Sequence, residues 1–393
     1  MRHLFFVCLV AIVQVAQAQT AFPIYNTPGP HAVGFRVVQQ YDQTRSYPAP
    51  DPKSPQSTAA RTARPIQTAI WYPAVRGKTP LSYDDYLQLL GWDDDFDRPP
   101  AEQAKVIANW LKLVANGTRD AQIAAERRSL LWANRDAPLM PGKFPVIVYS
   151  PSISSNAFEN TEMMEFLASH GYVVLTSPAL GMRSRGQRAD IEHLEAQAAD
   201  IRFLVDYATT MPEADPLRIA AMGYSWGGFA IVLAAAKDSR IRALVSLDGT
   251  IRYRHKMVEQ LDYVKPEEMR IPMLYVAQRP APFERQLDFK PDLSGSFLRK
   301  MKNADVYLLT MYAMEHSHFA TSYLRLDPLE FNEYSLEEVA QGHGQVGRYV
   351  LNFLNGTMKG ERSGLEYLMQ KPEKTGAPAH SAYSQFFPAQ KTK

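Results

Sequence analysis

Apolar and polar residues follow two alternating patterns along most of this chain. Short runs rich in Val, Ile, Leu and Tyr favour strands, and longer stretches in which apolar residues return every three or four positions favour helices. Strands are predicted at residues 32–40, 65–72, 144–149, 172–176, 218–223, 241–247, 271–276 and 304–311. Helices are predicted at residues 161–170, 190–210, 227–237 and 347–359. This alternation predicts an α/β fold with a mostly parallel central sheet flanked by helices.

Two segments depart from this alternation. Residues 77–141 carry helical patterns and no clear strand, so we expect a helical insertion between the second and third strands. Three of the five tryptophans fall in it, and they could line a lid, form a wall for a bound group or make the insertion's own core. The acidic run at residues 93–97 is expected to be a solvated loop. Residues 371–393 are rich in Pro, Lys and small side chains, and we expect a weakly ordered tail.

The first 18 residues have the order of a secretory signal peptide. Arg2 precedes an unbroken apolar run at residues 4–13, and Ala16-Gln17-Ala18 offers small residues for cleavage. The run is about half of the roughly 20 residues that span a bilayer. We therefore expect residues 1–18 to be removed on export to the periplasm or the medium, leaving one folded domain at residues 19–370 and no transmembrane segment. The only cysteine, Cys8, would leave with the signal peptide.

Composition excludes several classes of protein. The chain has 393 residues and a formal net charge of +2, without the basic excess that is typical of nucleic-acid binding. It contains no Gly-rich phosphate loop, no dinucleotide fingerprint and no convincing spacing of metal ligands. We therefore expect no nucleic-acid partner, no metal and no cofactor, whereas the oligomeric state stays open.

One short motif indicates nucleophilic chemistry. The sequence Gly223-Tyr224-Ser225-Trp226-Gly227 is a G-x-S-x-G motif between a predicted strand and an Ala-rich predicted helix. A serine on such a sharp turn needs neighbours without side chains two positions away, and Gly223 and Gly227 meet this need. We therefore predict Ser225 as a catalytic nucleophile and Tyr224 as a residue that lines the substrate pocket.

A nucleophilic serine needs a base and an acid that orients the base. In this arrangement the acid and then the histidine follow the serine along the chain. Asp248 comes directly after the next predicted strand, at the sheet edge where catalytic groups collect. His316 and His318 both follow the strand at 304–311, and only one of them can point at the serine. We predict His316 as the base and keep His318 as the alternative.

The oxyanion of the reaction also needs backbone donors. The N–H of Trp226, directly after the nucleophile, is one candidate, and the loop after the strand at 144–149 should supply the other. Pro151 in that loop has no N–H to give, and we predict Ile153 as the second donor.

These motifs together resemble the α/β-hydrolase superfamily, and within it the secreted dienelactone hydrolase-like and platelet-activating-factor acetylhydrolase-like serine esterases. The resemblance covers about residues 29–75 and 142–360 and leaves the insertion uncovered in detail. It implies an acid at Asp248, and it supports Ile153 by position: acetylhydrolases usually carry His-Gly-Leu-Gly where this chain has Pro151-Ser152-Ile153-Ser154. True dienelactone hydrolases use a cysteine nucleophile, which the exported chain would lack.

The sequence therefore predicts hydrolysis of a carboxylic ester through a Ser-His-Asp triad and an acyl-enzyme intermediate. The expected substrate is a small-molecule or lipid-like ester. An amidase or peptidase on the same triad and a non-catalytic binding protein on a hydrolase fold remain alternatives.

Overall fold

The computed structural model describes residues 25–47, 63–77, 79–115, 117–118, 120–279, 296–326 and 334–390. The predicted signal peptide at residues 1–18 lies outside these ranges. Among the described residues, no helix combines the length and the apolar character that crossing a membrane requires.

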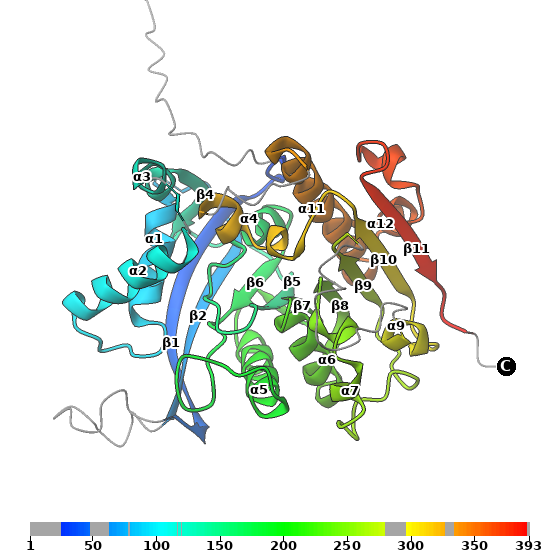
Figure 1. The fold of residues 1–393 in the computed structure, drawn as a ribbon, viewed down its shortest axis with the longest axis horizontal. Coiled ribbons are helices and arrows are strands. Elements are labelled where there is room, and N and C mark those ends of the chain that lie inside the picture. Colours follow the sequence, from blue (N-terminus) through cyan, green and yellow to red (C-terminus); the bar gives the residue numbers. More distant parts are fainter. Residues whose placement is uncertain are drawn as a thin grey trace, which may run out of the picture.

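The described strands form one eleven-stranded sheet in the order β11-β10-β9-β8-β7-β5-β6-β2-β1-β4-β3 (Figure 1). Strands β6, β5, β7, β8, β9 and β10 run parallel to one another, and antiparallel pairs occur at β2–β6, β1–β2, β3–β4 and β10–β11. The strands are β1 (Ala32–Ser46), β2 (Ala63–Ala74), β3 (Pro80–Ser82), β4 (Leu130–Arg135), β5 (Phe144–Ser150), β6 (Val173–Thr176), β7 (Ala214–Tyr224), β8 (Ile241–Leu247), β9 (Met273–Ala277), β10 (Val306–Met311) and β11 (Ala382–Phe387). The predicted α/β class with a mostly parallel sheet is confirmed.

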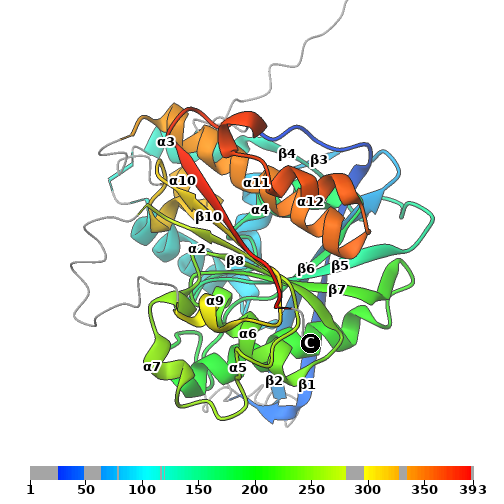
Figure 2. The same cartoon turned by 90° about the vertical axis from the view of Figure 1, so that its right-hand side faces the viewer.

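Helices cover both faces of this sheet. Helices α4 (Thr161–Ser169) and α11 (Leu336–Met358) lie on one face, and α5 (Ile191–Ala208) and α6 (Gly227–Lys237) lie on the other (Figures 1 and 2). The remaining helical elements are α1 (Tyr83–Leu87), η2 (Gln88–Trp92), α2 (Pro100–Val114), α3 (Asp120–Arg128), η3 (Thr250–Arg252), α7 (His255–Val258), α9 (Ser296–Lys300), η4 (His316–Phe319), α10 (Thr321–Leu326), α12 (Arg362–Leu368) and η5 (Pro372–Thr375). Because both faces are covered, β6 and β9 are buried along their whole length and β5 is buried except at its first residue, as is typical of parallel sheets.

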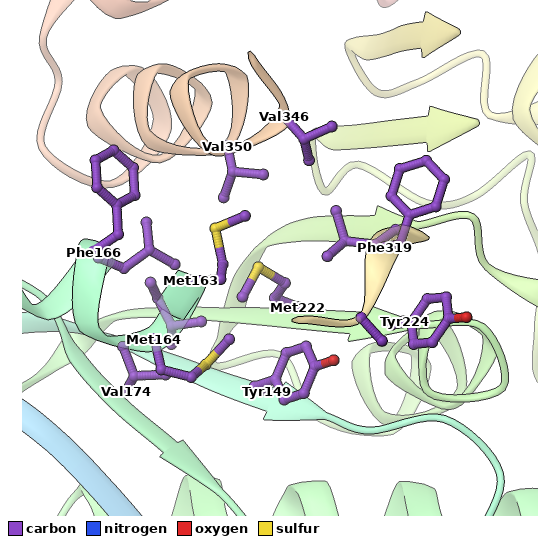
Figure 3. Packing of buried hydrophobic residues seen from close by; sticks show 14 of the residues in the cluster. Tyr149, Met163, Met164, Phe166, Val174, Met222, Tyr224, Phe319, Val346 and Val350 are labelled. Carbon is purple, nitrogen blue, oxygen red and sulfur yellow. The ribbon is translucent and has the colours of Figure 1, made fainter. Parts of the chain in front are cut away.

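The core has a layer on each side of the sheet. On the α4 and α11 side, Met163, Met222 and Val350 belong to one buried cluster, and Figure 3 shows these side chains filling the space between α11 and the strands. On the other side, α5 and α6 pack through residues such as Leu204 and Ile231. The two layers hold the carboxyl ends of the parallel strands at one edge, where the predicted catalytic residues lie.

The insertion at residues 77–141 is not purely helical. It contains α1, η2, α2 and α3, but β3 and β4 also extend the sheet, and β4 runs parallel to β1 with Ala133 opposite Val33. The prediction missed β4 because its alternation is short: Leu131 and Ala133 are buried between less buried neighbours. The tryptophans at 92, 110 and 132 pack against the main core cluster, so the insertion shares the core of the sheet.

The prediction of a weakly ordered tail at residues 371–393 was wrong for most of that segment. After η5, strand β11 pairs antiparallel with β10 over Val306–Met311, and the ring of Phe386 stacks on Tyr307 with centroids 4.7 Å apart. The composition of this segment is typical of a weakly ordered tail. The segment is ordered because β11 pairs with β10, which would otherwise be the edge strand of the sheet.

Candidate active site

Ser225 occupies a sharp turn between β7 and α6. Its φ angle is 53°. This value lies in the left-handed region, which is energetically unfavourable for a residue other than glycine. Its N–H donates to the carbonyl of Leu247 at 3.0 Å, and its own carbonyl accepts from the N–H of Thr250 at 2.8 Å. These bonds hold the strained turn from both sides.

The two glycines of the motif are needed because backbones approach closely here. A side chain on Gly227 would collide with the carbonyl oxygens of Ser150 and Pro151, and a side chain on Gly223 would collide with the backbone of Gly227. The turn that carries Ser225 is therefore packed directly against the end of β5. The predicted role of both glycines as space for the turn agrees with this geometry.

Asp248 follows β8 and is fully buried. Its Oδ1 accepts hydrogen bonds from the N–H of Gln278 at 3.1 Å and from the hydroxyl of Tyr253 at 2.9 Å. Its φ angle of 41° is also in the left-handed region. These contacts hold Oδ1 in place, and Oδ2 faces His316.

His316 joins Asp248 to Ser225. It is the first residue of η4, in the segment 312–322 that follows β10 and is called here the histidine loop. Its Nδ1 lies 2.6 Å from Asp248 Oδ2, and its Nε2 lies 2.8 Å from Ser225 Oγ. A carboxylate can only accept, so Nδ1 donates to Asp248, and in the tautomer with its proton on Nδ1 the ring accepts at Nε2 from the serine hydroxyl. The structure thus brings together the three residues that the sequence singled out.

His318, the alternative base, occupies a different position. Its side chain is buried, and its Nδ1 accepts from the N–H of Glu315 at 3.0 Å. Burial, together with the charges of Arg279 and His343, lowers the pKa of His318 to about 4. The ring is therefore a neutral part of the histidine loop, and His316 is the residue beside Ser225.

Tyr224, predicted to line the substrate pocket, supports the histidine loop. It is only 2% exposed, and its hydroxyl donates to the carbonyl of His316 at 2.8 Å. Its ring centroid lies 5.1 Å from that of the His316 imidazole. No local pattern predicts this contact, because it joins positions 92 residues apart in the chain.

The two predicted oxyanion donors are the N–H groups of Ile153 and Trp226. Ile153 belongs to the β5 loop, defined as residues 151–155, and Trp226 directly follows Ser225 in the turn. In the β5 loop the N–H of Ser152 donates to Glu159, and the N–H of Ser154 donates to Gln187 Oε1 at 2.9 Å. Among the described residues, the N–H groups of Ile153 and Trp226 have no acceptor. The collision described for Gly227 places the backbone of Ser150 and Pro151 beside the turn.

One group of potential metal ligands lies at the start of α5. Within the described ranges, Asp190, Glu192 and His193 could offer atoms within 4.8 Å of one another at the start of α5. Asp190 is the N-cap residue of that helix, and its carboxylate accepts from the N–H of His193 at 3.0 Å. Helix capping accounts for this cluster.

Comparisons with known proteins agree with the fold. The model of the dienelactone hydrolase family matches residues 132–277, a stretch from β4 to the end of β9 that includes Ser225 and Asp248. The solved structure of a ferulic acid esterase from Streptomyces cinnamoneus superimposes with a TM-score of 0.61 and 19% sequence identity, covering 92% of this chain and 98% of that chain. Residues 132–277 are thus similar to the dienelactone hydrolase family, and the chain as a whole has the fold of the esterase structure. No curated protein gives a significant match.

The family match ends before the histidine loop. His316 lies 39 residues beyond the last matched position, 277 (316 minus 277). Its place beside Ser225 therefore rests on the hydrogen bonds of the structure and not on the family match.

Proposed function

We propose that this α/β hydrolase cleaves carboxylic esters, with Ser225 as nucleophile, His316 as base and Asp248 as the acid that orients the base. The observation that carries the proposal is the continuous pair of hydrogen bonds, 2.6 Å from Asp248 to His316 and 2.8 Å from His316 to Ser225. This arrangement matches what an activated serine requires: a base within hydrogen-bond reach and a third group that holds the base.

In the proposed reaction, Ser225 Oγ attacks the ester carbonyl while its proton passes to His316 Nε2. The carbonyl oxygen becomes an oxyanion that accepts from the N–H groups of Ile153 and Trp226. The tetrahedral intermediate then expels the alcohol, which takes the proton from His316. A water molecule next attacks the acyl-serine, His316 accepts its proton, and the proton returns to Ser225 as the acid leaves. Asp248 stabilises the imidazolium in both halves of the cycle.

Esters are the favoured substrate class for two reasons. The chain is related to a family of lactone hydrolases, and the solved structural neighbour is named an esterase of ferulic acid. No cofactor enters the steps above.

The insertion is proposed to border the path by which substrate reaches Ser225. Arg185, in the segment after β6, pairs with Asp93 of the insertion at 2.8 Å and donates to the carbonyl of Ser154 in the β5 loop at 3.3 Å. Asp93 was expected in a solvated loop, but it is buried, and burial raises its pKa to about 6. The insertion is thus connected to the loop that carries one of the proposed oxyanion donors.

We also propose that residues 1–18 direct export and are then removed, on the order of the charged start, apolar run and small residues in the sequence. Mass spectrometry of the protein recovered from the medium or periplasm tests this proposal. A protein that retains residue 1 in the cytoplasm contradicts it.

A matched pair of substrates tests the reaction class. The wild-type protein and Ser225→Ala are assayed on the p-nitrophenyl ester and the p-nitroanilide of the same short acyl group. We expect turnover of the ester, little turnover of the anilide, and loss of ester turnover in the folded variant. Preferred cleavage of the anilide would favour an amidase, and turnover of neither would favour a binding protein.

A further inference from the structure

The β5 loop needs support that its own sequence does not supply. None of residues 151–155 is glycine, and Ser154 has a φ angle of 57° in the left-handed region. The N–H of Ile153 lies between two anchored residues: Ser154 is bound on one side by Gln187, and Ser152 is bound on the other side by Glu159. The direction of the Ile153 amide therefore depends on these anchors.

Glu159 is a buried carboxyl that binds the β5 loop directly. It is 0% exposed, and it accepts hydrogen bonds from the N–H of Ser152 at 3.0 Å, from the hydroxyl of Ser152 and from the hydroxyl of Tyr149 at 2.8 Å. Burial raises the pKa of Glu159, and the hydrogen bonds from the two serines, Ser152 and Ser155, act in the opposite direction. A buried carboxylate is costly unless such donors satisfy it, so the loop and the carboxylate stabilise each other.

The same short segment binds the histidine loop. The carbonyl of Glu159 accepts from the N–H of Ser322 at 3.1 Å, and the Oδ1 of Asn160 accepts from the N–H of Thr321 at 3.0 Å. The Nδ2 of Asn160 donates to the hydroxyl of Tyr149 at 2.7 Å, and this hydroxyl donates to Glu159. Residues 159 and 160 are thus bonded to the β5 loop on one side and to the histidine loop on the other.

We propose that Glu159 and Asn160 are positioning residues that align the Ile153 amide with His316 and Ser225. The proposal rests on the proposed function and deepens it, because it assigns a cause to the orientation of one oxyanion donor. Neither side chain touches the substrate, and both act through the two loops that do. A misaligned donor weakens binding of the transition state more than binding of the substrate. Replacement of either residue should therefore lower kcat more than it changes KM.

Glu165 offers a matched control for the loss of a buried carboxylate. It lies on α4, is 1% exposed, and accepts from the hydroxyl of Tyr86 at 2.7 Å and from the N–H of Trp132 at 2.6 Å. These partners belong to the insertion and not to the β5 loop. Replacement of Glu165 should therefore perturb packing of the insertion without moving the Ile153 amide.

The test compares wild type, Glu159→Gln, Asn160→Ala and Glu165→Gln on a p-nitrophenyl ester, with circular dichroism and urea unfolding as checks on the fold. We expect Glu159→Gln to lower kcat by about 10- to 100-fold with little change in KM. Asn160→Ala should lower kcat about fivefold, and Glu165→Gln should stay within about twofold of wild type. A kcat for Glu159→Gln close to that of an active wild type, or equal losses in Glu159→Gln and Glu165→Gln, overturns the proposal.

Two further results keep the outcome clear. If Glu159→Gln does not fold, Ser152→Ala takes its place, because it removes one donor to the same carboxylate; we expect kcat to fall about fivefold, and an unchanged kcat overturns the proposal. A wild-type protein without ester turnover overturns the proposed function and, with it, this inference. An active wild type beside an unaffected Glu159→Gln overturns the inference alone.

Discussion

The imidazole Nε2 of His316 lies 2.8 Å from the hydroxyl oxygen of Ser225, although 91 residues separate the two in the chain. Parallel strands account for this approach, because the turn after β7 and the loop after β10 both leave the carboxyl edge of the sheet.

The first prediction concerns Asp248, the acid that binds His316. Asp248→Asn should lower kcat by about 10³- to 10⁴-fold, since an amide no longer stabilises the imidazolium or favours the correct tautomer. Steady-state kinetics on a p-nitrophenyl ester measure the loss, and a fall smaller than tenfold contradicts the assigned role.

The two neighbouring histidines should differ sharply in their effect on catalysis. His316→Ala removes the group beside Ser225 and should abolish measurable ester turnover. His318→Asn keeps an acceptor for the N–H of Glu315 and should leave kcat within several-fold of wild type while lowering stability. Kinetics and thermal unfolding on both variants check this prediction. The reverse order of activities would make His318 the base.

Removal of the Ile153 N–H tests the oxyanion donor. Ile153→Pro deletes this hydrogen, and we expect kcat to fall by about 10²- to 10³-fold. Ile153→Val keeps the amide and serves as the control with near wild-type kcat. Equal activity of the two folded variants would remove Ile153 from the oxyanion hole.

Glu165 should make stability depend on pH. Burial raises the pKa of Glu165 to about 7 from an ordinary value of 4.5, so the folded protein holds this proton more tightly than the unfolded chain does. Its favourable contribution is complete below pH 4.5 and is lost as the pH rises through 7. The free energy of unfolding of wild type minus that of Glu165→Gln should fall across this window by on the order of 3 kcal/mol. Urea unfolding at several pH values measures the difference, and a constant or rising difference contradicts the prediction.

The C-terminal strand should contribute measurably to stability. A chain that ends at residue 370 loses β11 and exposes the edge of β10, so we expect Tm to fall by on the order of 5 °C and aggregation to increase. A chain that lacks only residues 391–393 is the control. Equal Tm values for the two truncated proteins would show that the pairing with β10 contributes little.

Local sequence patterns predicted the central sheet and the position of the candidate nucleophile in the fold well. The apolar runs at 144–149 and 241–247 agree with β5 and β8, and the G-x-S-x-G motif placed Ser225 on the turn after β7. These features depend on short-range sterics and periodicity, which a single sequence displays.

Long-range contacts explain what the sequence did not predict. Strand β11 forms by pairing with β10, and β4 forms by pairing with β1, which lies about 100 residues away in the chain. The choice between His316 and His318 depended on which side chain faces Ser225. The hydrogen bond from Thr321 to Asn160 joins residues about 160 positions apart in the chain. Neither composition nor spacing reveals such pairings.

Labelling with a fluorophosphonate tests the central claim most directly. The wild-type protein and Ser225→Ala are incubated with the reagent, and the adduct is located by peptide mass spectrometry while ester turnover is followed. Attack by an activated serine forms the phosphorus–oxygen bond and releases fluoride, so we expect one adduct, on Ser225, with loss of turnover in proportion to labelling. Ser225→Ala should be folded, unlabelled and inactive. Ester turnover that persists in Ser225→Ala, or in fully labelled wild type, would contradict the account.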